Sequence, residues 1–127
     1  MSNRNKKIGN EFEEMFSQLL FDNGFWVHKL YATEAGQPAD IIAVKNRRAY
    51  LIDCKVCTDG SFVLSRIEDN QDSAMTLWED CGNGEALFAL LVDGEIYMAT
   101  YGQLQTQTGR VSEEWIKANC PTWEELI

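Results

Sequence analysis

The 127-residue sequence lacks any apolar run long enough to cross a lipid bilayer, which would need about 20 residues. Its first residues, MSNRNKK, lead into a charged helical pattern rather than the apolar core of a signal peptide. Internal repeats, low-complexity segments and linker-like stretches are also lacking. These absences argue against a membrane-embedded or exported protein. They predict a soluble cytoplasmic protein with one domain over residues 1–127.

Positive charge is scarce: there are 11 Lys and Arg residues and 20 Asp and Glu residues, so the formal net charge is −9. This balance disfavours a protein that coats nucleic acid generally, because phosphates attract a basic surface. The basic residues are unevenly distributed. Residues 1–66 contain nine of them and eight acids, whereas residues 67–127 contain two and twelve acids. A DNA-facing surface in the first half and an acidic far side are compatible with the total charge.

The four cysteines do not supply the pairs of close ligands that a structural zinc site requires. Cys54 and Cys57 form one CxxC pair, but Cys81 and Cys120 are distant, and there is no second close pair of Cys or His. We therefore expect reduced and mostly buried thiols, as in a typical cytoplasmic protein.

The most informative stretch is GQPADIIAVKNRRAYLIDCK, residues 36–55, which predicts a turn, a strand, a polar hairpin and a second strand. The apolar run 41–44 is typical of a strand buried on both faces. Asp40 precedes the first strand and Asp53 lies near the end of the second, so the hairpin can make them neighbours. Asp53 and Lys55 are two positions apart and should therefore project from the same face of the sheet.

Two carboxylates and one ammonium group at one end of a sheet need a physical reason, because Asp and Lys are rarely buried unpaired. Two like charges at ~4 Å repel by about 4 kcal/mol at an effective dielectric near 20, whereas an exposed salt bridge contributes only about 0–1 kcal/mol. We interpret the cluster as a site for a hard cation, and oxygen-only ligands favour Mg²⁺. From the residues alone an alternative stays open: Asp40 caps a turn, and Asp53 and Lys55 form a solvated strand end.

Periodicity and turn signals place the remaining elements. Residues 6–23 predict an amphipathic helix with Glu13 beside its apolar stripe, and Ser65 is expected to cap a helix over 66–80 that carries Gln71. The stripe comprises Ile8, Phe12, Met15, Phe16, Leu19 and Leu20, and the second helix should direct Ile67, Ala74, Met75, Leu77 and Trp78 inward. Strands are expected at 25–31, 49–56, 86–92 and 95–100, the last two joined by an Asp93-Gly94 turn, and short helices at 101–106 and 112–119.

Several of these residues together resemble the PD-(D/E)xK nuclease superfamily. Asp40 and the run Asp53-Cys54-Lys55 fit its signature, with Asp53 where most members carry Glu. Glu13 in GNEFEEMF and the Gly24-Phe25 step are similar to the archaeal Holliday junction resolvases (Hjc). The stretch SFVLSRIEDNQDSAM, which contains Gln71, looks like the corresponding segment of the RecU-type resolvases. The resemblance implies an α/β fold with a restriction-endonuclease-like core, in which helices flank a mixed central β-sheet in the order αβββαβ.

The same resemblance implies a Mg²⁺- or Mn²⁺-dependent DNA endonuclease, and most specifically a Holliday junction resolvase acting on branched DNA as a homodimer. The implied metal ligands are Glu13, Asp40, Asp53 and the carbonyl group of Cys54. Lys55 would orient or activate the attacking water, and Gln71 would help to position substrate or a metal-bound water. Alternatively, Gln71 is an ordinary surface residue of its helix. We expect a bacterial or phage-encoded enzyme, since the small size and acidic second half fit a phage protein.

Candidate contacts to DNA phosphates are the basic residues of the first half and two polar residues of the loop before Asp40: Lys6, Lys7, Arg47, Arg48, Arg66, Thr33 and Gln37. Such contacts position DNA without specifying its sequence. Loop polarity alone would also predict Thr33 and Gln37. Two other functions stay open: a nicking or restriction-type nuclease of the same fold, and a non-catalytic DNA-binding accessory module in recombination.

Overall fold

The computed structural model describes residues 3–31 and 36–126. Its helices are α1 (Asn3–Asp22), α2 (Asp69–Asp80), α3 (Tyr101–Gln105) and α4 (Glu113–Asn119), with short 3₁₀ helices η1 (Leu64–Arg66) and η2 (Trp123–Leu126). Its strands are β1 (Trp26–Lys29), β2 (Ile41–Lys45), β3 (Arg48–Val56), β4 (Phe62–Val63), β5 (Leu87–Val92), β6 (Glu95–Thr100) and β7 (Arg110–Val111). Within the described ranges no helix is both long and apolar enough to cross a membrane.

Five strands form one mixed sheet in the order β1-β2-β3-β5-β6. Neighbouring strands are antiparallel except for β3 and β5, which run parallel because α2 carries the chain from one to the other. This confirms the predicted α/β fold with a mixed central sheet. The ribbon that β4 forms with β7 lies outside that sheet, and the sequence did not reveal β7.

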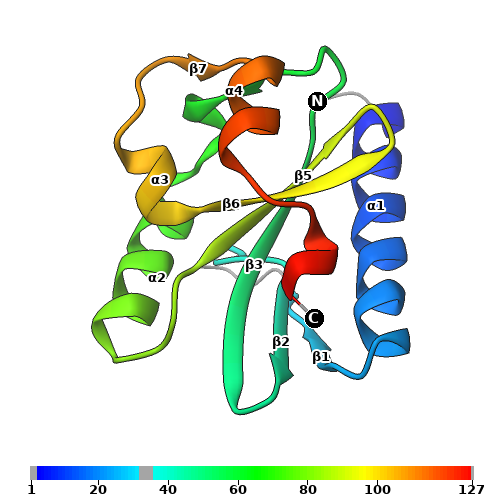
Figure 1. The fold of residues 1–127 in the computed structure, drawn as a ribbon, viewed down its shortest axis with the longest axis vertical. Helices are drawn as coiled ribbons and strands as arrows, with labels where there is room; N and C mark the ends of the chain where they lie inside the picture. Colours follow the sequence, from blue (N-terminus) through cyan, green and yellow to red (C-terminus); the bar gives the residue numbers. More distant parts are fainter. Residues whose placement is uncertain (1–2, 32–35, 127) are drawn as a thin grey trace.

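Helices cover both faces of the sheet, with α1 on one side and α2 on the other (Figure 1). The α1 face of the core contains Phe12, Phe16 and Leu20, each at most 3% exposed. The predicted position of Met15 is wrong, since its side chain is 45% exposed. The buried row is the i, i+4 series from Phe12 to Leu20, and Met15 lies on the outer flank of that row. Glu13 lies on the opposite flank and is half-buried.

The β2–β3 hairpin has the register that the sequence suggested, with Ile41 opposite Ile52. Its turn residues Asn46 and Arg47 have φ angles of 53° and 66°, as a two-residue hairpin with this twist requires. The expectation that residues 41–44 are buried on both faces holds only in part. Ile41 and Ala43 are fully buried on the α1 side, whereas Ile42 and Val44, which point to the other face, are half-buried.

Helix α2 begins at Asp69, three residues later than predicted, and the expected cap Ser65 and first helical residue Arg66 belong to η1 instead. Its N-cap is Glu68 and not Ser65: the backbone N–H of Glu68 donates to Gln71 Oε1 at 3.2 Å, which is half of a capping box. Leu77 was also wrongly placed, since it is 63% exposed while Met75 is fully buried.

The C-terminal elements follow the sequence closely. The hairpin of β5 and β6 turns at Asp93 and Gly94, with φ angles of 49° and 78°, and β5 lies between two other strands as expected of its apolar sequence. Ser112 caps α4 by accepting a hydrogen bond from the Trp115 N–H. The four cysteines are free: Cys57 and Cys120 are buried, Cys54 is half-buried and Cys81 is exposed.

Candidate active site

Asp40 and Asp53 meet where β2 begins and β3 approaches its end. The Asp40 N–H donates to the carbonyl of Ile52 at 3.1 Å, and the Cys54 N–H donates to Asp40 Oδ2 at 2.7 Å. The Asp53 side chain is almost fully buried, and Lys55 Nζ lies 3.1 Å from Asp53 Oδ2. The expected convergence of two acids and one lysine is therefore confirmed, and the alternative of a solvated strand end is wrong.

Gln71 connects α2 to this cluster. Its side chain is buried, and its amide Nε2 donates to Asp53 Oδ1 at 2.9 Å. Its carbonyl Oε1 accepts from the Glu68 N–H, and Lys55 Nζ lies 3.5 Å from the same atom. Gln71 is therefore not a surface residue, and it orients the side chains of Asp53 and Lys55 at once.

Burial and mutual repulsion raise the pKa values of two carboxyl groups in the site. Burial, followed by the negative charge of Asp40, raises the pKa of Glu13 to about 7, and a hydrogen bond between these two side chains adds to the shift. Burial and the charge of Asp40 also raise the pKa of Asp53 to about 8, although Lys55 opposes the shift. Carboxyl groups with such pKa values are poised to exchange a proton for a cation.

The donor set fits a divalent cation. Asp53 Oδ2 is buried and, within the described part of the chain, accepts no hydrogen bond of regular geometry, despite its closeness to Lys55 Nζ. Among the described residues, no group of three or more Asp, Glu, His or Cys side chains is arranged to hold a metal ion by itself. Mg²⁺ does not need one, because it usually retains water and binds one or two carboxylates together with substrate phosphate oxygens. Burial and the neighbouring acids raise the pKa of the Cys54 thiol, so its carbonyl oxygen is the more suitable ligand.

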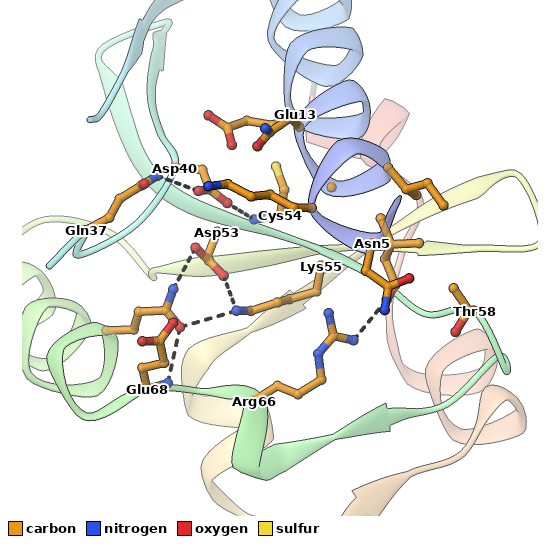
Figure 2. Close-up of a pocket in the computed structure, with 16 residues that line it drawn as sticks. Asn5, Glu13, Gln37, Asp40, Asp53, Cys54, Lys55, Thr58, Arg66 and Glu68 are labelled. Atoms are coloured by element: carbon orange, nitrogen blue, oxygen red, sulfur yellow. Dashed lines mark hydrogen bonds and ion pairs between the residues drawn. The ribbon is translucent and has the colours of Figure 1, made fainter. Parts of the chain in front are cut away.

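These groups line a cavity of about 440 Å³ between α1, the end of β3 and the start of α2. In Figure 2 the acids lie on one side of Lys55, while Asn5, Thr58 and Arg66 lie on the other. The lining of the cavity is therefore acidic around Asp53 and polar or basic around Arg66, and the Lys55 ammonium group lies on the acidic side, 3.1 Å from Asp53 Oδ2. A phosphodiester in the cavity could contact a metal held by the acids and hydrogen-bond donors near Arg66.

The predicted phosphate contacts divide into separate groups. Lys6 and Arg66 line the cavity; the Arg66 guanidinium also donates to the carbonyl of Val56 at 2.9 Å. Lys7 lies on the neighbouring surface of α1, where its ammonium group is 3.9 Å from Glu11. Arg47 and Arg48 line a different cavity at the other end of β3 and do not join the site.

The two loop residues have different outcomes. Thr33 lies outside the described residues. Gln37 lines the cavity, but its amide Nε2 donates to Asp40 Oδ1 at 2.6 Å, so this group holds a carboxylate of the site. Sequence reasoning missed Asn10 and Thr58, which also line the cavity. Asn10 precedes Glu13 by three positions, so the helical period could have identified it.

Comparison with known proteins gives one family and one fold. The model of the family described as archaeal Holliday junction resolvase (Hjc) matches residues 4–124. The solved structure of a Holliday junction resolvase, Hjc from the hyperthermophile Archaeoglobus fulgidus, is similar with a TM-score of 0.70 and 21% sequence identity. The similarity covers 93% of each chain, and at this identity it establishes the fold alone. No curated protein sequence matches the chain.

Proposed function

The chain belongs to the archaeal Holliday junction resolvase (Hjc) family, and on that basis we propose how its residues cut branched DNA. It is a DNA endonuclease of the family's type, which resolves Holliday junctions with the help of a divalent metal ion. The family is archaeal and gives no support to the expected bacterial or phage origin. The observation that carries the proposal for the catalytic residues is the convergence of Asp40, Asp53 and Lys55 in one cavity with Glu13.

We propose Mg²⁺ as the ion, with Mn²⁺ as its substitute. The ligands would be Glu13, Asp40, Asp53 and the carbonyl oxygen of Cys54, all of which line the cavity. When bound, the ion would polarise the scissile phosphate and lower the pKa of the attacking water. The hard oxygen donors and the raised pKa values of two carboxyl groups support this choice.

Lys55 is proposed to act directly on the reacting groups. Its side chain is 13% exposed, and its ammonium group lies beside Asp53 in the cavity, where the metal, water and phosphate would meet. There the ammonium group would orient the attacking water and offset negative charge that develops on the phosphate in the transition state. Gln71 would keep this ammonium group and Asp53 in place through its two amide atoms.

The basic residues are proposed to place the DNA backbone relative to the metal. Lys6 and Arg66, in the cavity, would contact phosphates that flank the scissile bond, and Lys7 would extend this contact along α1. Arg47 and Arg48 are at the opposite end of β3, so they would contact a different arm of a branched substrate. These contacts supply salt-dependent affinity and not sequence specificity.

A cleavage assay with three conditions tests the function. We expect the protein to cut a four-way junction at symmetric positions in Mg²⁺, to leave linear duplex of the same sequence intact, and to lose all cleavage in EDTA. Cutting or nicking of the linear duplex at a similar rate would favour the restriction-type alternative. Tight junction binding without any cleavage in Mg²⁺ or Mn²⁺ would favour the accessory module.

We also propose a homodimer, because two symmetric cuts in one junction call for two active sites related by a two-fold axis. Light scattering at micromolar concentration is expected to give twice the chain's mass of 14.5 kDa, both free and with a junction bound after subtraction of the DNA. A mass of one chain under both conditions would contradict the dimer.

A further inference from the structure

Both carboxylate oxygens of Asp40 accept a hydrogen bond. Oδ2 accepts from the Cys54 N–H at 2.7 Å, and Oδ1 accepts from Gln37 Nε2 at 2.6 Å. The first donor belongs to the backbone of β3 and is fixed by the sheet. The second is a side chain of the segment that enters the site before Pro38, so its position depends on what holds that segment. Two donors in fixed places determine the plane in which a carboxylate can offer its remaining lone pairs to a metal ion.

Asn70, the second residue of α2, holds this segment. Its side-chain amide Nδ2 donates to the backbone carbonyl of Gln37 at 2.9 Å, across 33 positions of sequence. The contact is close: a Cβ atom at Gly36 would lie 2.7 Å from the same Asn70 nitrogen, and Gly36 has a φ of 93°, which L side chains rarely adopt. Glycine at position 36 therefore lets the Asn70 amide approach the Gly36–Gln37 backbone.

We propose that Asn70 is a positioning residue for Asp40, acting through Gln37. The adjacent Gln71 holds Asp53 directly, so two successive residues in the first turn of α2 position the side chains of Asp40 and Asp53. The side-chain amide is the suitable group in each case, since it donates to an oxygen without adding charge to an acidic site. This inference rests on the proposed function in one respect: it takes Asp40 to be a ligand of the metal ion.

A purely structural role for Asn70 would have a different consequence. A hydrogen bond that only fastens a loop contributes modestly to stability, and its loss would leave the metal affinity of the folded protein unchanged. Loss of an outer partner of a metal ligand instead weakens metal binding or activity by about 10–100-fold. Metal affinity therefore separates the two roles.

The experiment measures Mn²⁺ affinity of the full chain by titration calorimetry without DNA, and the Mg²⁺ concentration that gives half-maximal junction cleavage. For Asn70→Ala we expect both to shift by about 10-fold toward weaker binding. Junction binding in EDTA and the far-ultraviolet circular dichroism spectrum should stay as in the wild type. Ser73→Ala, a substitution at an exposed position one turn further along α2, is the matched control and should change neither metal measurement.

Gln37→Ala supplies the second variant and keeps the test decisive if Asn70→Ala folds poorly. It should weaken Mn²⁺ binding at least as much as Asn70→Ala. Adding Asn70→Ala to it should cost less than about a further twofold, since Asn70 acts through Gln37. The inference would be overturned if Mn²⁺ affinity is unchanged in folded Asn70→Ala or in Gln37→Ala. It would also be overturned if the two losses multiply in the double variant. In either case, junction cleavage by the wild type would leave the proposed function intact. A wild type that neither binds Mn²⁺ nor cuts junctions would overturn both.

Discussion

Replacement of Lys55 by alanine is expected to slow junction cleavage by about 10³-fold at saturating Mg²⁺, because one preorganised donor to a developing charge accounts for about that factor. The ammonium group lies 3.1 Å from Asp53 Oδ2 and only 3.5 Å from Gln71 Oε1, so its place is determined by two elements of the fold. Single-turnover kinetics on a fluorescent four-way junction would measure the effect on the chemical step, separate from product release.

The controls for this substitution address charge and binding. Lys117→Ala removes a partly exposed lysine that pairs with Glu113 on α4, and it should leave the cleavage rate unchanged. Lys55→Arg keeps the charge but should recover little activity, since a planar guanidinium group does not fit a site shaped for an ammonium group. Junction affinity in EDTA should change little in Lys55→Ala. A Lys55→Ala variant that cuts as fast as the wild type would remove this residue from the mechanism.

Asp53→Asn is expected to reduce cleavage by at least about 10³-fold and, at the same time, to stabilise the metal-free protein. The activity falls because a neutral amide replaces an anionic ligand and metal stabilisation of transition-state charge is worth several kcal/mol. The stability rises because the wild-type carboxylate is almost fully buried near Asp40, whereas asparagine has the same shape without the charge.

The stabilisation should depend on pH with a definite sign. The pKa of Asp53 is raised from 3.8 to about 8 in the folded protein, so folding favours its protonated form. Wild-type stability in EDTA should therefore be greatest near pH 4 and fall as pH rises toward 8. The substituted asparagine side chain cannot ionise, so the melting temperature of Asp53→Asn should exceed that of the wild type by ~4 °C or more at pH 8, about 1 kcal/mol for this size of domain, and by much less near pH 5.

Added metal should then act on the wild type alone. Mg²⁺ at pH 8 should raise the melting temperature of the wild type, because a ligand that binds only the native state stabilises it, and it should have little effect on Asp53→Asn. Asp80→Asn, which removes an exposed acid at the end of α2, provides the charge-matched control for both measurements. Equal melting temperatures of wild type and Asp53→Asn across pH 5–8 would show that the Asp53 carboxylate is not destabilising.

The local sequence pattern was sufficient to predict the hairpin that brings Asp40 and Asp53 together. Alternation along residues 49–56 places Asp53 and Lys55 on one face, and a two-residue turn at Asn46 and Arg47 returns the chain so that Asp40 meets the end of β3. The local pattern was not sufficient to predict the residue at which α2 begins. Ser65 is a good N-cap by type, but the capping pair of Glu68 and Gln71 begins the helix three residues later.

Short stretches of sequence were thus enough to establish the α/β class, the paired strands and the meeting of Asp40, Asp53 and Lys55, because those features follow from periodicity and turn chemistry. Long-range packing was needed to establish that Gln71 enters the site and that Gln37 holds Asp40, whereas the Arg47–Arg48 turn lies away from it. Those outcomes depend on how α1 and α2 pack on opposite faces of the sheet, which brings together groups tens of residues apart. Such packing follows from the shape of the whole core and leaves no local signal in the sequence.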